Sequence, residues 1–439
     1  MMRVVRRNTE LGLILLAAVI TGGAYVLASL GRTATLPADV VPFLGVVLAL
    51  LGVAHVATRR LAPAADGMLL PLAALLNGIG YVFIARLDHD LAALQSLWTA
   101  VGVFAFVLTL LIVRRARDLE RYRYTLALVG VALLMLPLVP GIGQNIHGNR
   151  IWVRVGGASF QPGELAKIVL AVFFASYLVD KQALLSQTRR FFGLMLPQLS
   201  LKHLGPILLA WAVSLVVMLA EKDLGSSLLF FALFVAMLWV ATARAAYLGL
   251  GGLLFGAGSF LAWETFGHVQ DRVRIWINPW PYDQGFQLVQ AMFALAAGGL
   301  SGTGISLGNP QRIPVVTTDF IFAAIGEELG LFGTTAVLAA ILLMVGAGLR
   351  IALRADSGFE KLLAVGLTTI LGVQSFIIIG GVIRVVPLTG VTLPFVSYGG
   401  SSLVANYILL ALLLRISNDS AERQAAVVVA DETRVQQRG

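Results

Sequence analysis

The chain contains no cysteine, so disulfide bonds and thiolate metal sites are excluded. Charge is also scarce: charged residues make up 13% of the 439 residues, whereas about 25% is usual in soluble domains. The five histidines show no metal-ligand spacing, so no metal site is predicted, and the chain has no nucleotide-binding P-loop. The function is therefore not expected to depend on cysteine chemistry or on nucleotide hydrolysis at a P-loop.

Hydrophobic residues make up 58% of the chain, which predicts an all-α polytopic membrane protein. Apolar runs of about 20 residues recur, and each can cross a hydrocarbon core of roughly 30 Å as a helix. The first run follows arginines and lacks a convincing cleavage site, so we interpret it as a retained span. Twelve spans are predicted, at about residues 10–31, 39–57, 68–85, 92–113, 124–140, 164–180, 204–220, 224–242, 246–266, 327–349, 360–382 and 396–414.

The basic residues predict the orientation of these spans. If the N-terminus is cytoplasmic and the spans alternate, 22 of the 32 basic residues fall on the cytoplasmic side. Cytoplasmic loops of membrane proteins carry such an excess, so both termini are predicted to be cytoplasmic. The same loops account for the net charge of +9, and a nucleic-acid partner is therefore not expected.

Three polar segments fall on the predicted outer side: large loops at 141–163 and 268–317, and a shorter segment at 385–395. The shorter segment and the residues after it contain two prolines and several glycines, which predicts non-helical backbone at bilayer depth. Such backbone is tolerated where protein or water satisfies its amides, as in the re-entrant wall of a polar cavity. The alternative is a helix end whose small residues allow close packing.

The outer segments contain candidate binding groups. Pro162 suits the first turn of a helix, and Glu164 and Lys167 are three residues apart on one face of it. They form either a local ion pair in a capped helix or a polar pair at the mouth of an outer cavity. Glycine-rich backbone at 298–304 is a weaker candidate for cradling phosphate oxygens. The outer arginines that could bind an anionic group are Arg150, Arg154, Arg272, Arg274, Arg312 and Arg384.

Three carboxylates lie within ten residues in this charge-poor chain: Asp319, Glu327 and Glu328. Acids near the membrane are energetically costly and need a partner, so at least one glutamate should face a cavity or an arginine. Asp319 also has a structural interpretation, in which Thr317 or Thr318 caps a helix whose first turn carries the acid. The helix dipole would then lower the pKa of Asp319.

Four separated motifs together resemble the SEDS family (shape, elongation, division and sporulation), to which RodA and FtsW belong. The resemblance covers about residues 68 to 418, and the family has ten spans. We therefore expect two additional N-terminal helices at 1–62, a ten-helix catalytic core at 63–418 and a flexible cytoplasmic tail at 419–439. The additional helices resemble RodA-type proteins of actinobacteria. The motifs are Gln161-Pro162-x-Glu164-Leu165-Ala166-Lys167, Asp223-Leu224-Gly225, Thr318-Asp319-Phe320-Ile321-Phe322-Ala323 with Glu327-Glu328, and Pro387-x-Thr389-Gly390 through Ser402.

The resemblance implies a peptidoglycan glycosyltransferase of the plasma membrane, which polymerises lipid II on the outer face for cell elongation or division and for cell shape. It implies a class B penicillin-binding protein and other elongation or division proteins as partners. Asp319 matches the family's catalytic acid, and Glu164 and Lys167 match its cavity residues. Glu327 and Ser397, in the same motifs, are further predicted substrate contacts.

The implied chemistry needs a base for a sugar hydroxyl and positive charge for a pyrophosphate leaving group. Asp319 is the predicted base, and the outer arginines and Lys167 are candidates for the pyrophosphate. A divalent cation, Mg²⁺ or Mn²⁺, would also serve, although no ligand cluster in the sequence demands one. Two alternatives remain: a transporter that flips lipid II, and a non-catalytic scaffold in which Asp319 only caps a helix.

Overall fold

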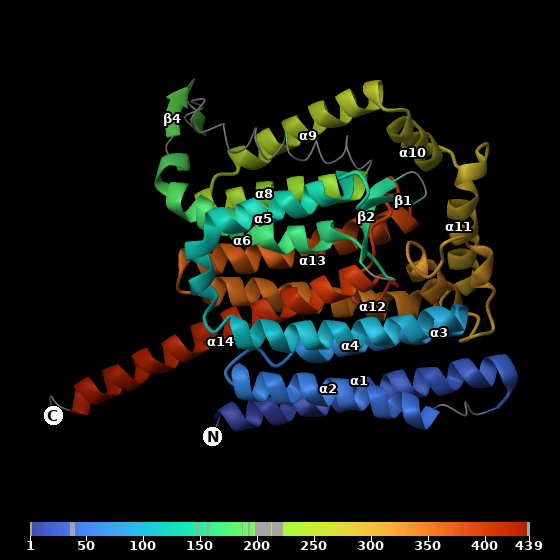
Figure 1. Ribbon diagram of the computed structural model, residues 1–439, viewed down its shortest axis with the longest axis horizontal. Coiled ribbons are helices and arrows are strands. Elements are labelled where there is room, and N and C mark those ends of the chain that lie inside the picture. Colours follow the sequence, from blue (N-terminus) through green and yellow to red (C-terminus); the bar gives the residue numbers. More distant parts are fainter. Residues whose placement is uncertain are drawn as a thin grey trace.

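The computed structural model describes residues 2–35, 40–146, 149–155, 158–186, 188–191, 194–197, 212 and 223–436. In this part of the chain, eleven helices are long and apolar enough to cross a membrane, and they lie side by side (Figure 1). The predicted all-α polytopic membrane fold is confirmed. Eleven of the twelve predicted spans correspond to these helices, and the span predicted at 204–220 lies outside the described residues.

The spanning helices follow the apolar runs of the sequence. The fifth span combines a helix with two 3-10 turns, η1 (Ala116–Tyr122) and η2 (Leu136–Leu138). The eleven helices are α1 (Met2–Thr33), α2 (Val40–Leu61), α3 (Leu69–Leu87), α4 (His89–Ile112), α5 (Arg123–Met135), α6 (Pro162–Leu185), α8 (Leu224–Thr242), α9 (Ala246–Thr265), α12 (Ile321–Arg354), α13 (Gly358–Val382) and α14 (Gly400–Gln436).

The described ends of the chain lie at one end of the bundle, at the left in Figure 1, and the polar segments predicted as outer lie at the opposite end. There, β1 (Gly143–Ile146), β2 (Asn149–Val155) and β3 (Ala158–Phe160) form an antiparallel sheet in the order β1-β2-β3. Val153 pairs with Gly143 on one side and with Phe160 on the other. Away from this end, β4 (Thr188–Phe191) and β5 (Leu194–Pro197) form a second, two-stranded sheet.

The predicted loop at 268–317 is partly helical. It contains α10 (Gly267–Ile277) and α11 (Phe286–Gly298), with η3 (Asp283–Gly285) between them and η4 (Pro310–Arg312) after them. Leu288, Ala291 and Ala294 of α11 are buried, because this helix packs on α12. A segment of mixed polarity therefore forms amphipathic helices at the end of the bundle.

Helix α13 occupies the centre of the bundle and packs against α6, α8 and α12. It is buried along most of its length, as expected for a helix that is hydrophobic all round. Helix α14 packs along α4, and α1 and α2 pack on the α3–α4 side of the bundle (Figure 1). The central helices carry the polar residues described below, so the site rests on the most buried part of the fold.

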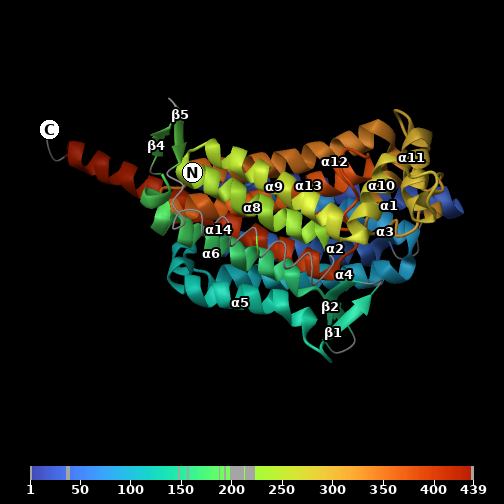
Figure 2. The same ribbon diagram turned by 90° about the horizontal axis from the view of Figure 1, so that it is seen from above.

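Helix α14 continues without a break into the predicted tail. The helix ends at Gln436, so residues 419–436 are helical rather than irregular. In Figures 1 and 2 this last stretch projects beyond the bundle. The flexibility of the tail stays a prediction.

Helix α12 is interrupted at Gly330, where φ is 65° and ψ is −160°. The segment after α11 fills the break, because the amides of Leu331 and Phe332 donate to the carbonyls of Gly299 and Leu300 at 3.0 and 3.2 Å. The helix also begins at Ile321, earlier than the span predicted at 327–349. Asp319 therefore lies two residues before the helix, and Glu327 and Glu328 lie within it.

Candidate active site

Asp319 lies in a turn between η4 and α12, not in the first turn of a helix. Its amide donates to the carbonyl of Val315 at 3.2 Å, and Phe320 separates it from the first residue of α12. No side chain caps the amides of α12. The interpretation of Asp319 as part of a threonine-capped first turn is therefore wrong.

The turn that carries Asp319 is held by the segment before α14. The Ser397 hydroxyl donates to the carbonyl of Thr318 at 2.6 Å and accepts from the amide of Leu393 at 3.0 Å. The amide of Tyr398 donates to the carbonyl of Thr317 at 2.9 Å. Ser397 is buried and its hydroxyl is bonded to both of these backbone groups, so it holds the turn in place. Its predicted contact with substrate stays a prediction.

Burial raises the pKa of the Asp319 carboxyl to about 6. A hydrogen bond with Thr318 and the charge of Arg272 lower this pKa, whereas the charge of Asp223 raises it. The raised pKa contradicts the lowered pKa expected at a helix N-terminus. The reason is that desolvation of the half-buried turn outweighs the groups that stabilise the carboxylate.

Asp223 and Arg272 therefore belong to the same site as Asp319. Asp223 is the N-cap of α8 and accepts from the amide and hydroxyl of Ser226 at 3.0 and 2.6 Å. The Arg272 guanidinium, on α10, donates to the carbonyl of Leu388 at 2.6 Å. The sequence predicted Arg272 as a binding group but assigned Asp223 no role. The available signal was an aspartate three residues before a serine at a helix start.

The backbone of the 383–399 segment approaches Asp319 closely. A Cβ at Gly390 would lie 3.6 Å from Oδ2 of Asp319, and the φ of this glycine is +78°, in the left-handed region. Thr389 and Val391 pack against the first turn of α8, where Gly225 leaves room for them. The predicted non-helical segment is confirmed, and it forms one wall beside the acid.

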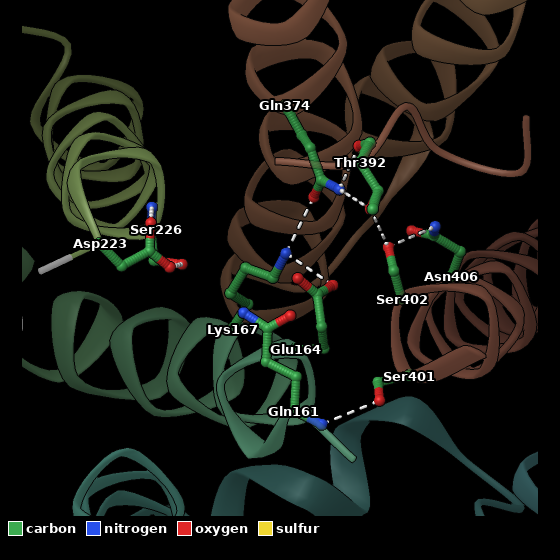
Figure 3. A network of polar contacts seen from close by, with 10 residues as sticks. All are labelled: Gln161, Glu164, Lys167, Asp223, Ser226, Gln374, Thr392, Ser401, Ser402 and Asn406. Atoms are coloured by element: carbon green, nitrogen blue, oxygen red, sulfur yellow. Dashed lines mark hydrogen bonds and ion pairs between the residues drawn. The ribbon is translucent and has the colours of Figure 1, made fainter. Parts of the chain in front are cut away.

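The predicted Glu164–Lys167 pair is confirmed near the start of α6, where Pro162 takes the first helical position. Glu164 Oε2 lies 2.8 Å from Lys167 Nζ, and both side chains are buried. Lys167 also donates to Gln374 Oε1 on α13 at 2.9 Å, and Gln374 donates to the carbonyl of Thr392 at 2.8 Å (Figure 3). The ion pair is thus joined to the segment that flanks Asp319.

Figure 3 shows that this network reaches α14. The Thr392 hydroxyl donates to Ser402 Oγ at 2.8 Å, and the Gln161 amide donates to Ser401 Oγ at 2.9 Å. Gln374 was missed by sequence reasoning. Its signal was a single polar amide within an otherwise apolar span, where a polar side chain needs partners.

The remaining predicted arginines are not brought to Asp319 in the described part of the chain. Arg384 is occupied, because its guanidinium donates to the carbonyls of Trp276 and Ile277 at 2.9 and 3.0 Å at the end of α10. The other four predicted arginines have exposed side chains: Arg150, Arg154, Arg274 and Arg312.

Glu327 and Glu328 fix the loop after α11. Glu328 forms an ion pair with Arg86 at 2.6 Å, as predicted for one of the two glutamates. Glu327 Oε1 accepts from the amide of Asn309 at 2.7 Å and is buried, so its carboxylate supports the loop.

Three amides of the predicted phosphate cradle at 298–304 are not available to bind a phosphate. Those of Gly302, Thr303 and Gly304 donate to the carbonyls of Gly298, Glu327 and Glu328 at 2.8 to 3.0 Å. These amides are therefore already bonded within the protein.

Residues 69–422 match the family model for cell cycle proteins that covers FtsW, RodA and SpoVE. The chain belongs to this family. The family match begins at the first residue of α3, so α1 and α2 lie outside it. Family membership confirms the resemblance that the motifs predicted, and the chain is a multi-pass membrane protein.

Family members resemble the chain over most of its length. The peptidoglycan glycosyltransferase RodA of Mycobacterium tuberculosis is 44% identical over 427 residues, which cover 94% of this chain and 91% of the relative. One chain of a solved peptidoglycan synthase complex is 29% identical, with a TM-score of 0.66 over 81% of this chain and 98% of that one. The rod shape determining protein RodA of Thermus thermophilus is 28% identical, with a TM-score of 0.58 over 81% and 97% of the two chains.

Proposed function

We propose that this family member is a peptidoglycan glycosyltransferase that polymerises lipid II into glycan strands. The observation that supports it most is the 44% identity, over 94% of the chain, to a relative named for that activity. The site supports the same conclusion, because a half-buried acid lies beside an arginine and a buried polar network. The relatives named RodA, one of them titled a rod shape determining protein, favour a role in elongation over division.

In the proposed reaction, Asp319 is the general base. The 4-hydroxyl of the acceptor sugar attacks the anomeric carbon of the donor, and its proton passes to the Asp319 carboxylate. The bond between that carbon and the pyrophosphate oxygen breaks, and the oxygen keeps the electron pair. A base with a pKa of about 6 is ionised at neutral pH and is a better proton acceptor than an ordinary aspartate.

Arg272 and Lys167 are the proposed cations for the pyrophosphate. The Arg272 guanidinium donates to the carbonyl of Leu388, two residues before the glycine that lies against the Asp319 carboxyl, so it can stabilise charge at the same centre. A planar guanidinium also suits phosphate oxygens geometrically. Lys167 has a third ammonium hydrogen beyond those donated to Glu164 and Gln374, and we assign it to the donor lipid.

We place the reaction on the outer face of the membrane. The charge bias predicts cytoplasmic termini. Asp319 follows the segment at 268–317, whose helices α10 and α11 lie at the end of the bundle opposite the described chain ends (Figure 1). The solved neighbour whose title joins polymerization to crosslinking supports a class B penicillin-binding protein as the partner. The partner would cross-link the strands that this chain forms.

Polymerisation of lipid II by the purified protein with its partner tests the assignment. Asp319→Asn keeps the shape of the side chain but removes the base, and we expect at least a 100-fold loss of polymer, within the range for general-base catalysis. Asp283→Asn, an exposed acid at the same end of the bundle, is the matched control and should keep full activity. Parent-like polymerisation by Asp319→Asn would show that the base assignment is wrong.

The same reconstitution separates the two alternatives. A flippase would move lipid II between leaflets without forming polymer, and a scaffold would do neither while still supporting the partner. The raised pKa of Asp319 and its position outside any helix cap favour catalysis over the scaffold, because a capping acid is stabilised in its ionised form.

A further inference from the structure

A cavity of about 590 Å³ is lined by the last turns of α12, whereas Asp319 precedes the first turn of this 34-residue helix. The cavity therefore lies far from Asp319. Its walls come from α1, the connection before α3, the last turns of α12 and the stretch of α14 from Ser417 to Gln424. The groups that bear on its chemistry are Glu10, Asp66, Arg350, Arg354 and Ser420. None of them takes part in the proposed transfer reaction.

Two cations in this cavity have no ion-pair partner within the described part of the chain. Arg350 and Arg354 lie one turn apart on α12, both are exposed, and neither guanidinium has an acceptor among the described residues. The acids are already bonded: Glu10 accepts from His55 Nδ1 at 2.9 Å, and Asp66 accepts from the amide of Met68 at 2.9 Å. An anionic ligand would therefore meet two free guanidinium groups.

A buried hydroxyl adds a second and independent signal. Ser420 is 3% exposed and lines the cavity, and within the described chain its Oγ has no hydrogen-bond partner. A buried polar group without a partner is costly, so an acceptor from outside the protein is expected. A phosphate group carries enough acceptor oxygens for the hydroxyl and for both guanidinium groups.

We propose that this cavity binds the phosphodiester headgroup of an anionic phospholipid. Basic pockets between membrane helices at the headgroup level bind such lipids. Leu13, an exposed apolar side chain of α1, lines the same cavity and gives an acyl chain a surface to pack on, which favours a lipid over soluble phosphate. The orientation proposed above makes this leaflet the inner one.

The lipid would join α1 to the family core. Helix α1 supplies one wall of the cavity and lies outside residues 69–422, whereas α12 and most of α14 lie inside them. A headgroup held by both parts stabilises their contact, because a ligand that binds only the assembled form shifts the equilibrium toward it. Anionic lipid should therefore raise the melting temperature of the full chain.

The test is lipid retention by the full chain in nanodiscs of phosphatidylglycerol and phosphatidylcholine, measured by native mass spectrometry. We expect one retained phosphatidylglycerol, and at least a tenfold weaker retention in the Arg350→Gln/Arg354→Gln variant, as for lost charge-assisted hydrogen bonds. The control is Arg59→Gln/Arg60→Gln, which removes two exposed arginines at the end of α2, outside the cavity. Ser420→Ala should weaken retention while keeping both charges.

Each other result would overturn the proposal. Equal loss in the two double variants would mean general attraction of anionic lipid to a basic surface. Equal retention of phosphatidylcholine would exclude recognition of the anionic headgroup. Displacement of the lipid by millimolar inorganic phosphate, with the same rise in melting temperature, would assign the cavity to a soluble phosphate compound.

Discussion

Ser397 and Thr318 are 79 residues apart in the chain, yet the Ser397 hydroxyl donates to the Thr318 carbonyl at 2.6 Å. Because Thr318 directly precedes Asp319, this bond fixes the peptide that carries the acid. The same hydroxyl accepts from the Leu393 amide, so the turn at 393–398 and the turn before α12 are held as one unit. The position of Asp319 therefore depends on a residue that does not contact substrate in our proposal.

Ser397→Ala should reduce polymerisation about tenfold while the protein stays folded, because a buried carbonyl and a buried amide each lose a partner at about 1–3 kcal/mol. Loss of positioning should lower kcat more than it raises KM, since the acid stays present but misplaced. Ser375→Ala is the matched control: its buried hydroxyl bonds only to Leu371 of its own helix. Equal effects of the two changes would remove the positioning role.

Polymerisation should rise with pH through about 6, the pKa of Asp319, because only the ionised carboxyl accepts a proton. Arg272→Gln should move this midpoint upward, since the charge of Arg272 lowers the pKa. Asp223→Asn should move it downward, since the charge of Asp223 raises the pKa. The measurement is a pH–rate profile of each variant that keeps detectable activity.

Opposite shifts from the two variants distinguish electrostatic coupling from general damage to the site. Asp271→Asn is the control, because this exposed acid on α10 is one residue from Arg272 but does not act on Asp319. If the midpoint of the pH–rate profile is the same in all variants, a group other than Asp319 titrates in the reaction.

Local spacing predicted only part of this site. The Glu164–Lys167 pair followed from three-residue spacing on one helix face, which depends on backbone geometry alone. The contact of Lys167 with Gln374 spans 207 residues and depends on how α6 packs on α13. Sequence periodicity predicted that both helices exist, but it does not determine which polar side chains meet between them.

The structural interpretation of Asp319, which predicted a lowered pKa, was wrong for a related reason. In that interpretation Thr317 or Thr318 caps the helix, whereas α12 begins at Ile321 and leaves the acid outside it. Burial of that turn by a distant segment then raised the pKa. The motif identified the acid, but its burial depends on packing against segments that are distant in the sequence.

The buried ion pair yields a prediction about stability and activity together. Lys167→Met leaves the Glu164 carboxylate buried without its cation, which should destabilise the fold by about 3–5 kcal/mol. Glu164→Gln combined with Lys167→Met should recover most of that loss, because no unpaired charge remains. The double variant should still be inactive in lipid II polymerisation, since the proposed ammonium contact with the donor is gone.

Thermal unfolding and the polymerisation assay read out these two effects separately. Arg117→Met is the control, because Arg117 and Glu120 have the same three-residue spacing but form an exposed pair at 3.8 Å. Such surface pairs contribute about 0–1 kcal/mol. Recovery of activity along with stability in the double variant would reduce Lys167 to a structural role.

Gly330 provides the sharpest test of the α12 interruption. Its φ of 65° is costly for other residues, and a Cβ there would overlap the backbone nitrogen of Gly302. Gly330→Ala should therefore lower stability by about 2–4 kcal/mol, from backbone strain together with overpacking. Gly346→Ala, in the regular part of α12 with open space around the site of its Cβ, should be neutral or stabilising by up to about 1 kcal/mol. Melting temperatures of the two variants decide this, and equal values would mean that the break at Gly330 does not hold the loop.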